Sequence, residues 1–158
     1  VIVGLLIYLV RQRRGESGFS GKGLLPWVLV CMVLVFIQIF LGTRVREVVD
    51  EVANQLNDRS AWISALGITF IIHRSFSWAI LVFHAVLLRK LWKSGRSRGF
   101  VLPLFLLILG TILSGTGMAY FAVPPFLQPV HLLLATLTFG LEFYLALQLN
   151  RTTKPVLS

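Results

Sequence analysis

The sequence predicts an all-α integral membrane protein, a four-helix transmembrane bundle with the end of a further helix before it. Hydrophobic residues make up 56% of the chain and charged residues only 13%, about half the charged share of a soluble domain. The apolar residues form long uninterrupted runs, so the lipid bilayer is the expected environment. The net charge of +9 does not indicate a nucleic-acid partner, because the basic residues flank the apolar runs as they do in membrane proteins.

Residues 1–23 precede the bundle and combine an apolar stretch with a basic linker. The stretch from Val1 to Val10 is too short to span a bilayer, and we interpret it as the end of a preceding transmembrane helix. The residues that follow, up to position 23, are expected to form a cytoplasmic linker. On this interpretation the chain is a piece of a longer protein.

Four transmembrane helices are expected in residues 24–149, because four segments reach the roughly 20 mainly apolar residues that a bilayer requires. Pro26 suits the first turn of the first helix, and Pro124-Pro125 ends the third helix before the fourth begins. The single cysteine, Cys31, lies within the first helix, so no disulfide within the chain is possible. Residues 150–158 are expected to form a cytoplasmic tail. The expected bounds of the helices are about 24–42, 64–88, 100–123 and 126–149.

The loop between the first two helices is expected to contain a short amphipathic helix that lies on the outer surface or caps the bundle. A plain solvated loop is the alternative. Its apolar residues recur at helical spacing, namely Val45, Val48 or Val49, Val52 and Leu56. Basic residues concentrate on the opposite side of the membrane, in residues 89–98, before the first helix and after the fourth. The positive-inside bias places that side, with both ends of the chain, in the cytoplasm.

Two histidines, His73 and His131, lie within the second and fourth predicted helices. Titratable side chains are costly in a bilayer, and imidazole is a common ligand of haem iron. The two helices run in the same direction and lie diagonally across an up-and-down bundle. His73 lies about 13 Å and His131 about 8 Å from the start of its helix. The sequence therefore predicts that both imidazoles bind one haem iron from opposite sides, in the outer half of the bundle.

Small and basic residues surround this predicted site. A flat macrocycle needs small neighbours, and the small residues near the right depth are Gly42, Ser114, Gly115, Thr116 and Gly117. Close helix packing is the alternative role for the three glycines. Arg74 is expected to bind a haem propionate, or alternatively to pair with Asp50 or Glu51. Arg44 and Arg46 are further candidates for the propionates.

A second polar pair is expected nearer the cytoplasmic side. His84 follows His73 by eleven residues and Glu142 follows His131 by eleven, which is about three helical turns. His84 and Glu142 are therefore expected to meet across the core, because each needs a polar partner in a membrane. The pair could relay protons, contact a quinol head group or have a purely structural role.

Several of these motifs together resemble those of the haem A synthase family. The segment from Gln38 to Arg46 ends in Gly-Thr-Arg-Val-Arg, which resembles the Gly-x-x-Val-Arg stretch of that family. His73-Arg74 matches its His-Arg ligand motif, and His131, which opens a helix rich in leucine and phenylalanine, matches the other axial ligand. The resemblance covers all four predicted helices.

The resemblance implies one half of an eight-helix protein, built from two tandem four-helix bundles in a bacterial plasma membrane. The N-terminal bundle of such a protein oxidises haem O, and the C-terminal bundle holds haem b. The catalytic bundle carries a glutamate three residues before its first histidine, where this chain has Phe70, so the chain is similar to the haem b half. His73 and His131 would then be the axial ligands of the haem b iron, and no catalytic residue is expected in this half.

The whole protein would be an oxidoreductase that converts a methyl group of haem O to the formyl group of haem A for cytochrome oxidase biogenesis. The fragment alone is not expected to catalyse this reaction. A haem O synthase, and a quinone or another electron acceptor, are partners that the sequence leaves open. Many family members have cysteine pairs in their outer loops, whereas residues 44–67 contain none.

Two other interpretations stay open. A b-type cytochrome that transfers electrons, as a subunit of a quinol-linked membrane complex, would share the bis-histidine site. A haem-free membrane protein would use the same histidines as buried structural groups.

Overall fold

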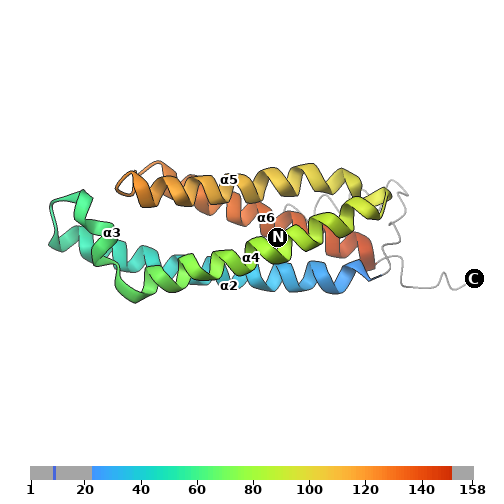
Figure 1. Ribbon diagram of the computed structural model, residues 1–158, viewed down its shortest axis with the longest axis horizontal. Coiled ribbons are helices and arrows are strands. Elements are labelled where there is room, and N and C mark those ends of the chain that lie inside the picture. The colour runs from blue at the N-terminus through green and yellow to red at the C-terminus, as the bar shows by residue number, and fades with distance from the viewer. Residues whose placement is uncertain (1–8, 10–22, 151–158) are drawn as a thin grey trace, which may run out of the picture.

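A computed structural model describes Leu9 and residues 23–150, and these residues form helices and turns with no strand among them. The predicted all-α membrane bundle is confirmed, because four helices are long and apolar enough to cross a membrane (Figure 1). The predicted helix end at residues 1–10, the basic linker and the tail lie outside the described residues, apart from Leu9. The long helices are α2 (Leu24–Gln55), α4 (Gly67–Lys93), α5 (Val101–Tyr120) and α6 (Leu127–Asn150), and η2 (Arg96–Phe100) joins α4 to α5.

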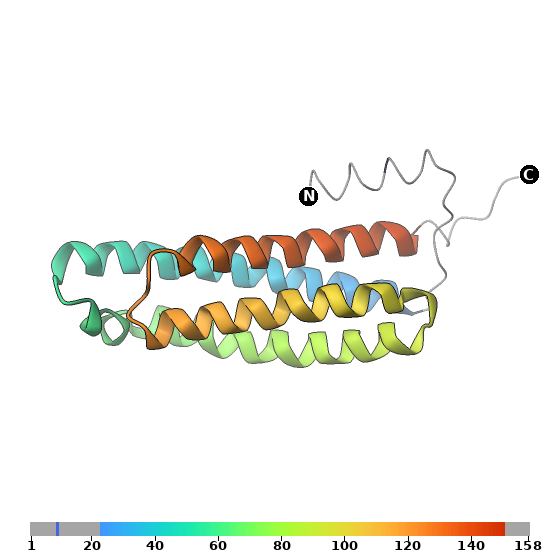
Figure 2. The same cartoon turned by 90° about the horizontal axis from the view of Figure 1, so that it is seen from above.

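The four helices are arranged so that α6 returns to the side of α2 (Figures 1 and 2). α2 packs closely against both α4 and α6, and α5 packs closely against α6. α4 contacts α5 much less, and α4 and α6 therefore lie diagonally across the bundle, as predicted. We call the end of the bundle at Leu24 and Asn150 the basic end, and the end at Gln55 and Leu127 the turn end.

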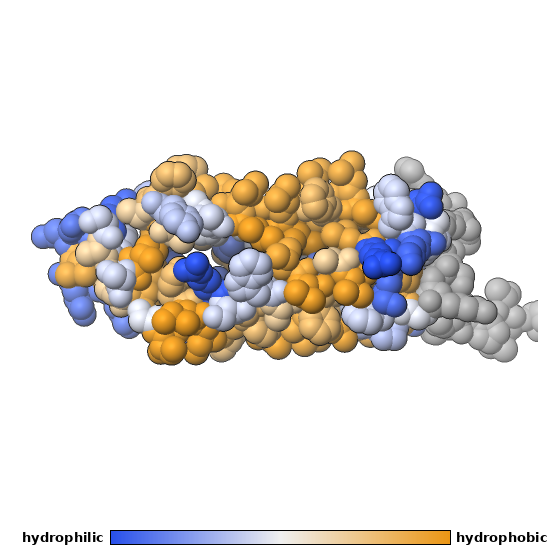
Figure 3. All heavy atoms as spheres, in the orientation of Figure 1, coloured by the Kyte–Doolittle hydropathy of each residue, from blue (hydrophilic) through white to orange (hydrophobic). Residues whose placement is uncertain are grey.

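Large apolar side chains cover the outside of the bundle between its two ends. Figure 3 shows this as a hydrophobic band with hydrophilic atoms at both ends of the molecule. The band includes exposed side chains of every long helix, such as Phe36, Ile71, Leu113 and Leu133. An apolar surface of this extent is unfavourable in water and favourable against lipid, which supports the membrane environment.

The inner side of α2 follows a heptad repeat along nearly its whole length. The residues on this side recur at alternating spacings of four and three, and each is buried or half-buried. This period favours a slight left-handed supercoil with the neighbouring helices. The residues are Leu24, Val28, Cys31, Val35, Gln38, Gly42, Val45, Val49 and Val52.

The predicted surface helix after the first span is instead a direct continuation of α2. The helix does not stop near residue 42, because no proline interrupts it and ion pairs along its own surface support the next turns. These pairs join Arg44 to Glu47 and Arg46 to Asp50. At 1.5 Å per residue α2 is about 48 Å long, so it extends beyond a hydrocarbon layer of about 30 Å. The apolar residues predicted for the surface helix lie at the turn end of α2, where Val49 and Val52 are buried.

The second predicted helix, expected to begin near residue 64, begins at Gly67. Before it the chain forms two short helices, η1 (Arg59–Ala61) and α3 (Trp62–Ala65). Gly67 has a φ of 60°, a conformation that glycine adopts readily and that separates α3 from α4. α4 then continues to Lys93, past the predicted end at residue 88, and its last-turn lysines interact favourably with the helix C-terminus.

The turn between α5 and α6 has a strained backbone that packing and hydrogen bonding support. Ala122 and Val123 have φ angles of 55° and 53°, in the left-handed region that side chains disfavour. The guanidinium of Arg59 donates a hydrogen bond of 2.9 Å to the carbonyl oxygen of Val123. The Val123 side chain is itself buried in one cluster with Val49 and Val52. The third helix consequently ends at Tyr120, before its predicted end at residue 123.

Two separate apolar cores occupy the ends of the bundle. The larger, basic-end core draws on all four long helices and includes Val28, Leu87, Leu104 and Leu145. The smaller, turn-end core contains Val49, Val52, Leu66 and Val123. Between the two, no residue of α4 from position 71 to 82 and no residue of α6 from 127 to 137 is fully buried. We call this level of the bundle the middle layer.

Candidate functional site

The middle layer contains both histidines that the sequence singled out. His73 lies in α4 and His131 in α6, each is half-buried, and the two imidazoles are near enough to interact electrostatically. Each ring lies against a glycine of a neighbouring helix. A Cβ atom added to Gly42 would lie 3.4 Å from Cε1 of His73, and one added to Gly115 would lie 3.0 Å from Cε1 of His131. The glycines therefore make room for the imidazoles.

The third glycine of the prediction has a different role. A Cβ atom at Gly117 would lie 2.9 Å from a methyl carbon of Leu127, so this glycine permits the close approach of α5 and α6. Close packing, the alternative considered from the sequence, is thus what the structure shows at Gly117.

Ser114 fixes the proton of the His131 ring. The Ser114 hydroxyl donates its hydrogen to the carbonyl oxygen of Thr111 at 3.0 Å, and its oxygen lies 2.9 Å from Nδ1 of His131. A hydroxyl has one hydrogen, and when it is donated to the Thr111 oxygen, which can only accept, Nδ1 carries the proton of the second hydrogen bond. The Nε2 atom of a neutral His131 then has a free lone pair, which is the tautomer that a metal-binding histidine needs.

His73 has a polar neighbourhood that leaves one of its nitrogens unsatisfied. The Gln38 amide donates hydrogen bonds to Ser77 Oγ at 2.8 Å and to the backbone oxygen of His73 at 3.1 Å, and it lies 3.5 Å from His73 Nε2. The His73 Nδ1 atom is buried and has no hydrogen-bond partner among the described residues. A buried unpaired nitrogen is costly, so this ring lacks a partner that a bound group would provide.

Gln38 and Ser77 are site residues that the sequence did not predict. Gln38 could have been selected from the sequence, because it is a lone amide in an apolar run and falls on the inner side of α2. Ser77 follows His73 by one helical turn, and its hydroxyl donates to the backbone oxygen of His73 at 3.0 Å. Such a bond within one helix is common for serine, so the sequence alone gave little reason to select it.

The three candidate arginines are all exposed. Arg44 and Arg46 are each paired with an acidic residue of α2 itself. Arg74 makes no hydrogen bond or ion pair within the part of the chain that the structure describes, and the alternative pairing with Asp50 or Glu51 is not formed. Arg74 is therefore the arginine whose charge is available beside His73.

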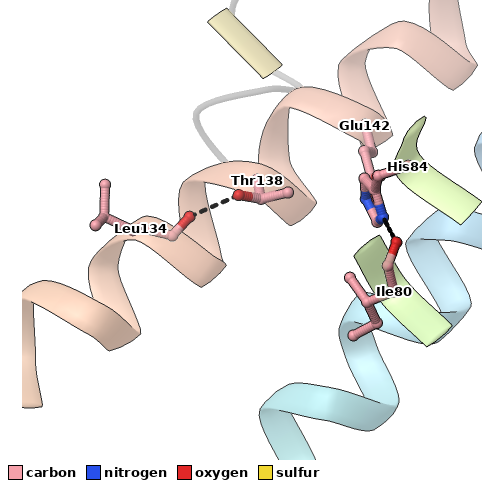
Figure 4. A network of polar contacts seen from close by, with 5 residues as sticks. All are labelled: Ile80, His84, Leu134, Thr138 and Glu142. Atoms are coloured by element: carbon pink, nitrogen blue, oxygen red, sulfur yellow. Dashed lines mark hydrogen bonds and ion pairs between the residues drawn. The ribbon is translucent and has the colours of Figure 1, made fainter. Parts of the chain in front are cut away.

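The second polar pair lies at the basic-end core. Nε2 of His84 is 2.7 Å from Oε1 of Glu142, and neither side chain is exposed (Figure 4). On its other side the His84 ring donates from Nδ1 to the carbonyl oxygen of Ile80, at 2.8 Å. Cys31 of α2, which the sequence analysis had treated only as a cysteine without a partner, lies beside this pair. Cys31 is far from His84 and Glu142 in the sequence, so the sequence gave no sign that the three residues meet.

The residues of the middle layer fit a haem. The layer offers a ligand-competent His131, a His73 nitrogen that lacks a partner, glycines beside both rings and an unpaired arginine. It lies where α4 and α5 diverge and where neither α4 nor α6 buries a residue completely.

Comparison with known proteins gives one match. A family model described as COX15-CtaA, cytochrome oxidase assembly protein, matches residues 1–143, which is most of the chain. No curated protein and no solved structure match the chain.

Proposed function

Because the chain belongs to the COX15-CtaA family of cytochrome oxidase assembly proteins, we propose that it is the haem b-binding half of a haem A synthase. In this proposal the bundle holds haem b in its middle layer, with His73 and His131 as the axial ligands of the iron. A haem bound between two histidines supplies a one-electron carrier. The whole protein converts haem O to haem A as a membrane oxidoreductase of the bacterial plasma membrane.

One observation carries the proposal: a layer between two apolar cores, in which neither α4 nor α6 buries a residue completely, contains two imidazoles from diagonal helices. Packing voids are few in ordinary protein interiors, and buried polar atoms are normally paired. A flat, largely apolar group with a metal at its centre would satisfy both needs at once. It would cover the half-buried side chains of this layer and place a partner beside the His73 ring, whose Nδ1 atom has none among the described residues.

The surrounding residues would hold the ligands in place. Ser114 keeps the proton of His131 on Nδ1 and leaves Nε2 free. Gln38 and Ser77 anchor α2 to α4 at the level of His73. Arg74, whose charge is unpaired, would bind a propionate at the edge of the site.

This bundle is not proposed to oxidise haem O itself. The position three residues before His73 is Phe70, which packs against the turn-end core and offers no carboxylate for proton transfer. Oxidation of haem O would then take place in another part of the whole protein. A haem O synthase and a quinone or another electron acceptor are its candidate partners.

The test is the absorption spectrum of the purified protein. The wild-type protein should show reduced b-type bands, and His73→Ala and His131→Ala should each abolish them. His84→Gln is the matched control, since it removes a histidine of the same bundle about three turns from His73, and it should keep the bands. A colourless, folded wild-type protein would exclude the proposal.

The electron-transfer subunit of a quinol-linked complex was the other candidate function. It would share the bis-histidine site, and a quinol contact at His84 and Glu142 would suit it, but neither side chain is exposed in the structure. No observation therefore favours that function over a role in oxidase assembly.

A further inference from the structure

Three side chains with metal-binding atoms meet inside the basic-end core. Cys31 comes from α2, His84 from α4 and Glu142 from α6, and one ligand atom of each lies within 4.8 Å of the other two. The exposed fraction of all three residues is 0%. This cluster is separate from the middle layer, and the proposed haem site makes no use of it.

The His84 ring is oriented as a metal ligand would be. A carbonyl oxygen only accepts hydrogen bonds, so the bond between Nδ1 and the Ile80 oxygen requires the proton to be on Nδ1. Nε2 is therefore the nitrogen that faces the cluster, and the proton that it shares with Oε1 of Glu142 is the one that a metal would replace. Metal-binding histidines are commonly held in this way, with the other ring nitrogen bonded to a backbone carbonyl.

Glu142 has an oxygen that nothing satisfies. Its Oε1 atom contacts His84 Nε2, whereas its Oε2 atom is buried and has no hydrogen-bond partner among the described residues. In Figure 4 the side chain of Glu142, from α6, lies against the imidazole of His84, from α4. A buried carboxylate with a free oxygen is costly, and a cation is the partner that would remove this cost.

The charges of the three ligands indicate the class of ion. A thiolate and a carboxylate carry one negative charge each and a neutral imidazole carries none, so a divalent cation makes the cluster neutral inside the membrane. Magnesium and calcium prefer oxygen ligands only, whereas zinc accepts sulfur, nitrogen and oxygen together. We propose that Cys31, His84 and Glu142 form a zinc site within the bundle.

Binding would proceed with a defined proton balance. Zinc forms bonds to Sγ of Cys31, Nε2 of His84 and one oxygen of Glu142, and the thiol proton is released to solvent. Any proton that Glu142 shares with His84 leaves in the same step. No electron is transferred, and three protein ligands leave the fourth tetrahedral position for a further ligand.

The test measures zinc in the purified protein after it has been loaded with zinc and freed of loosely bound metal. We expect about one zinc per chain, with one sulfur at roughly 2.3 Å in the zinc K-edge absorption spectrum. Cys31→Ser and Glu142→Gln should each weaken zinc binding by more than roughly 100-fold, because the loss of a residue that only orients a ligand already costs about 10- to 100-fold.

The matched control is Thr138→Val. Thr138 is buried on α6 one turn before Glu142. Among the described residues its hydroxyl bonds only to the Leu134 carbonyl oxygen, so this variant should bind zinc like the wild type. The proposal is overturned if the loaded wild-type protein holds no zinc, or if Cys31→Ser and Glu142→Gln retain it. If those variants do not fold, the wild-type spectrum decides, because a zinc without a sulfur neighbour also overturns the proposal.

The two proposed sites can fail independently. His73→Ala and His131→Ala should lose haem and keep zinc, whereas Cys31→Ser should lose zinc and keep haem. A wild-type protein with zinc and no haem would refute the proposed function alone.

Discussion

At the scale of single residues, the hydroxyl of Ser114 has the clearest predicted effect. Ser114→Ala should lower haem affinity by roughly 10- to 100-fold, because His131 loses the partner that fixes its tautomer. Haem content and titration of the haem-free protein measure this effect. Ser94→Ala makes the same chemical change at a serine whose hydroxyl, within the described part of the chain, bonds only to the Leu91 carbonyl oxygen, and it should leave haem binding unchanged. Equal haem affinity in both variants would contradict the role given to Ser114.

The glycine beside His131 is a second test at this scale. Gly115→Ala would place a methyl group 3.0 Å from the ring, so the imidazole must shift, and haem content should fall. Gly140→Ala is the control, because a Cβ atom there has no neighbour within 4 Å. The control should keep its haem and gain up to about 1 kcal/mol in the free energy of unfolding, since alanine favours a helix over glycine. Unchanged haem binding in Gly115→Ala would show that the ring has room to move.

The sequence predicted the two histidines but not the residues that orient them. His73 and His131 were conspicuous because a titratable residue is rare in an apolar run. The bond between Ser114 and His131 depends on how two helices pack, and the approach of Cys31 to Glu142 depends on α2 and α6 together. Neither contact follows from spacing along one helix.

At the scale of elements, the strained turn between α5 and α6 allows a stabilising substitution. Ala122→Gly should raise the free energy of unfolding by about 1 kcal/mol, because the φ angle of 55° costs alanine roughly 1–2 kcal/mol and glycine little. Thermal unfolding in detergent measures the change.

Ala135→Gly is the control for this prediction. Ala135 lies in the interior of α6, where glycine should instead destabilise by about 1 kcal/mol. If both glycine variants are destabilised to the same degree, the left-handed conformation of Ala122 carries no cost.

The four transmembrane helices could be predicted from the sequence, but the residues at which they begin and end could not be placed as well. The four spans follow from long apolar runs, which are a local property. The end of the first span was placed at residue 42, where charged residues begin, but a change from apolar to charged residues does not end a helix. α2 continues because its arginines and acidic residues pair along the helix surface and its valines pack against the turn-end core.

At the scale of the whole molecule, the two apolar cores predict where the bundle loses stability without haem. In a haem-free double variant, His73→Ala with His131→Ala, the backbone amides at residues 71–82 and 127–137 should exchange hydrogen faster, because neither core includes these residues. Amides beside Leu87 and Leu145, in the basic-end core, should stay protected. Hydrogen exchange with mass spectrometry measures both regions. An equal increase throughout the bundle would show that the cores do not act separately.

The inner side of α2, which follows a heptad repeat, sets the distance between the two proposed metal sites. Cys31 and Gln38 occupy the same side of the helix seven residues apart, which corresponds to about 10 Å along the axis. No loop or hinge lies between them, so thermal motion of the turns cannot alter that spacing. One residue inserted between them would rotate everything beyond it by about 100°, turning Gln38 and Gly42 away from His73 while Cys31 kept its place. Length changes should thus be tolerated in the loops of this protein and not in the first half of α2.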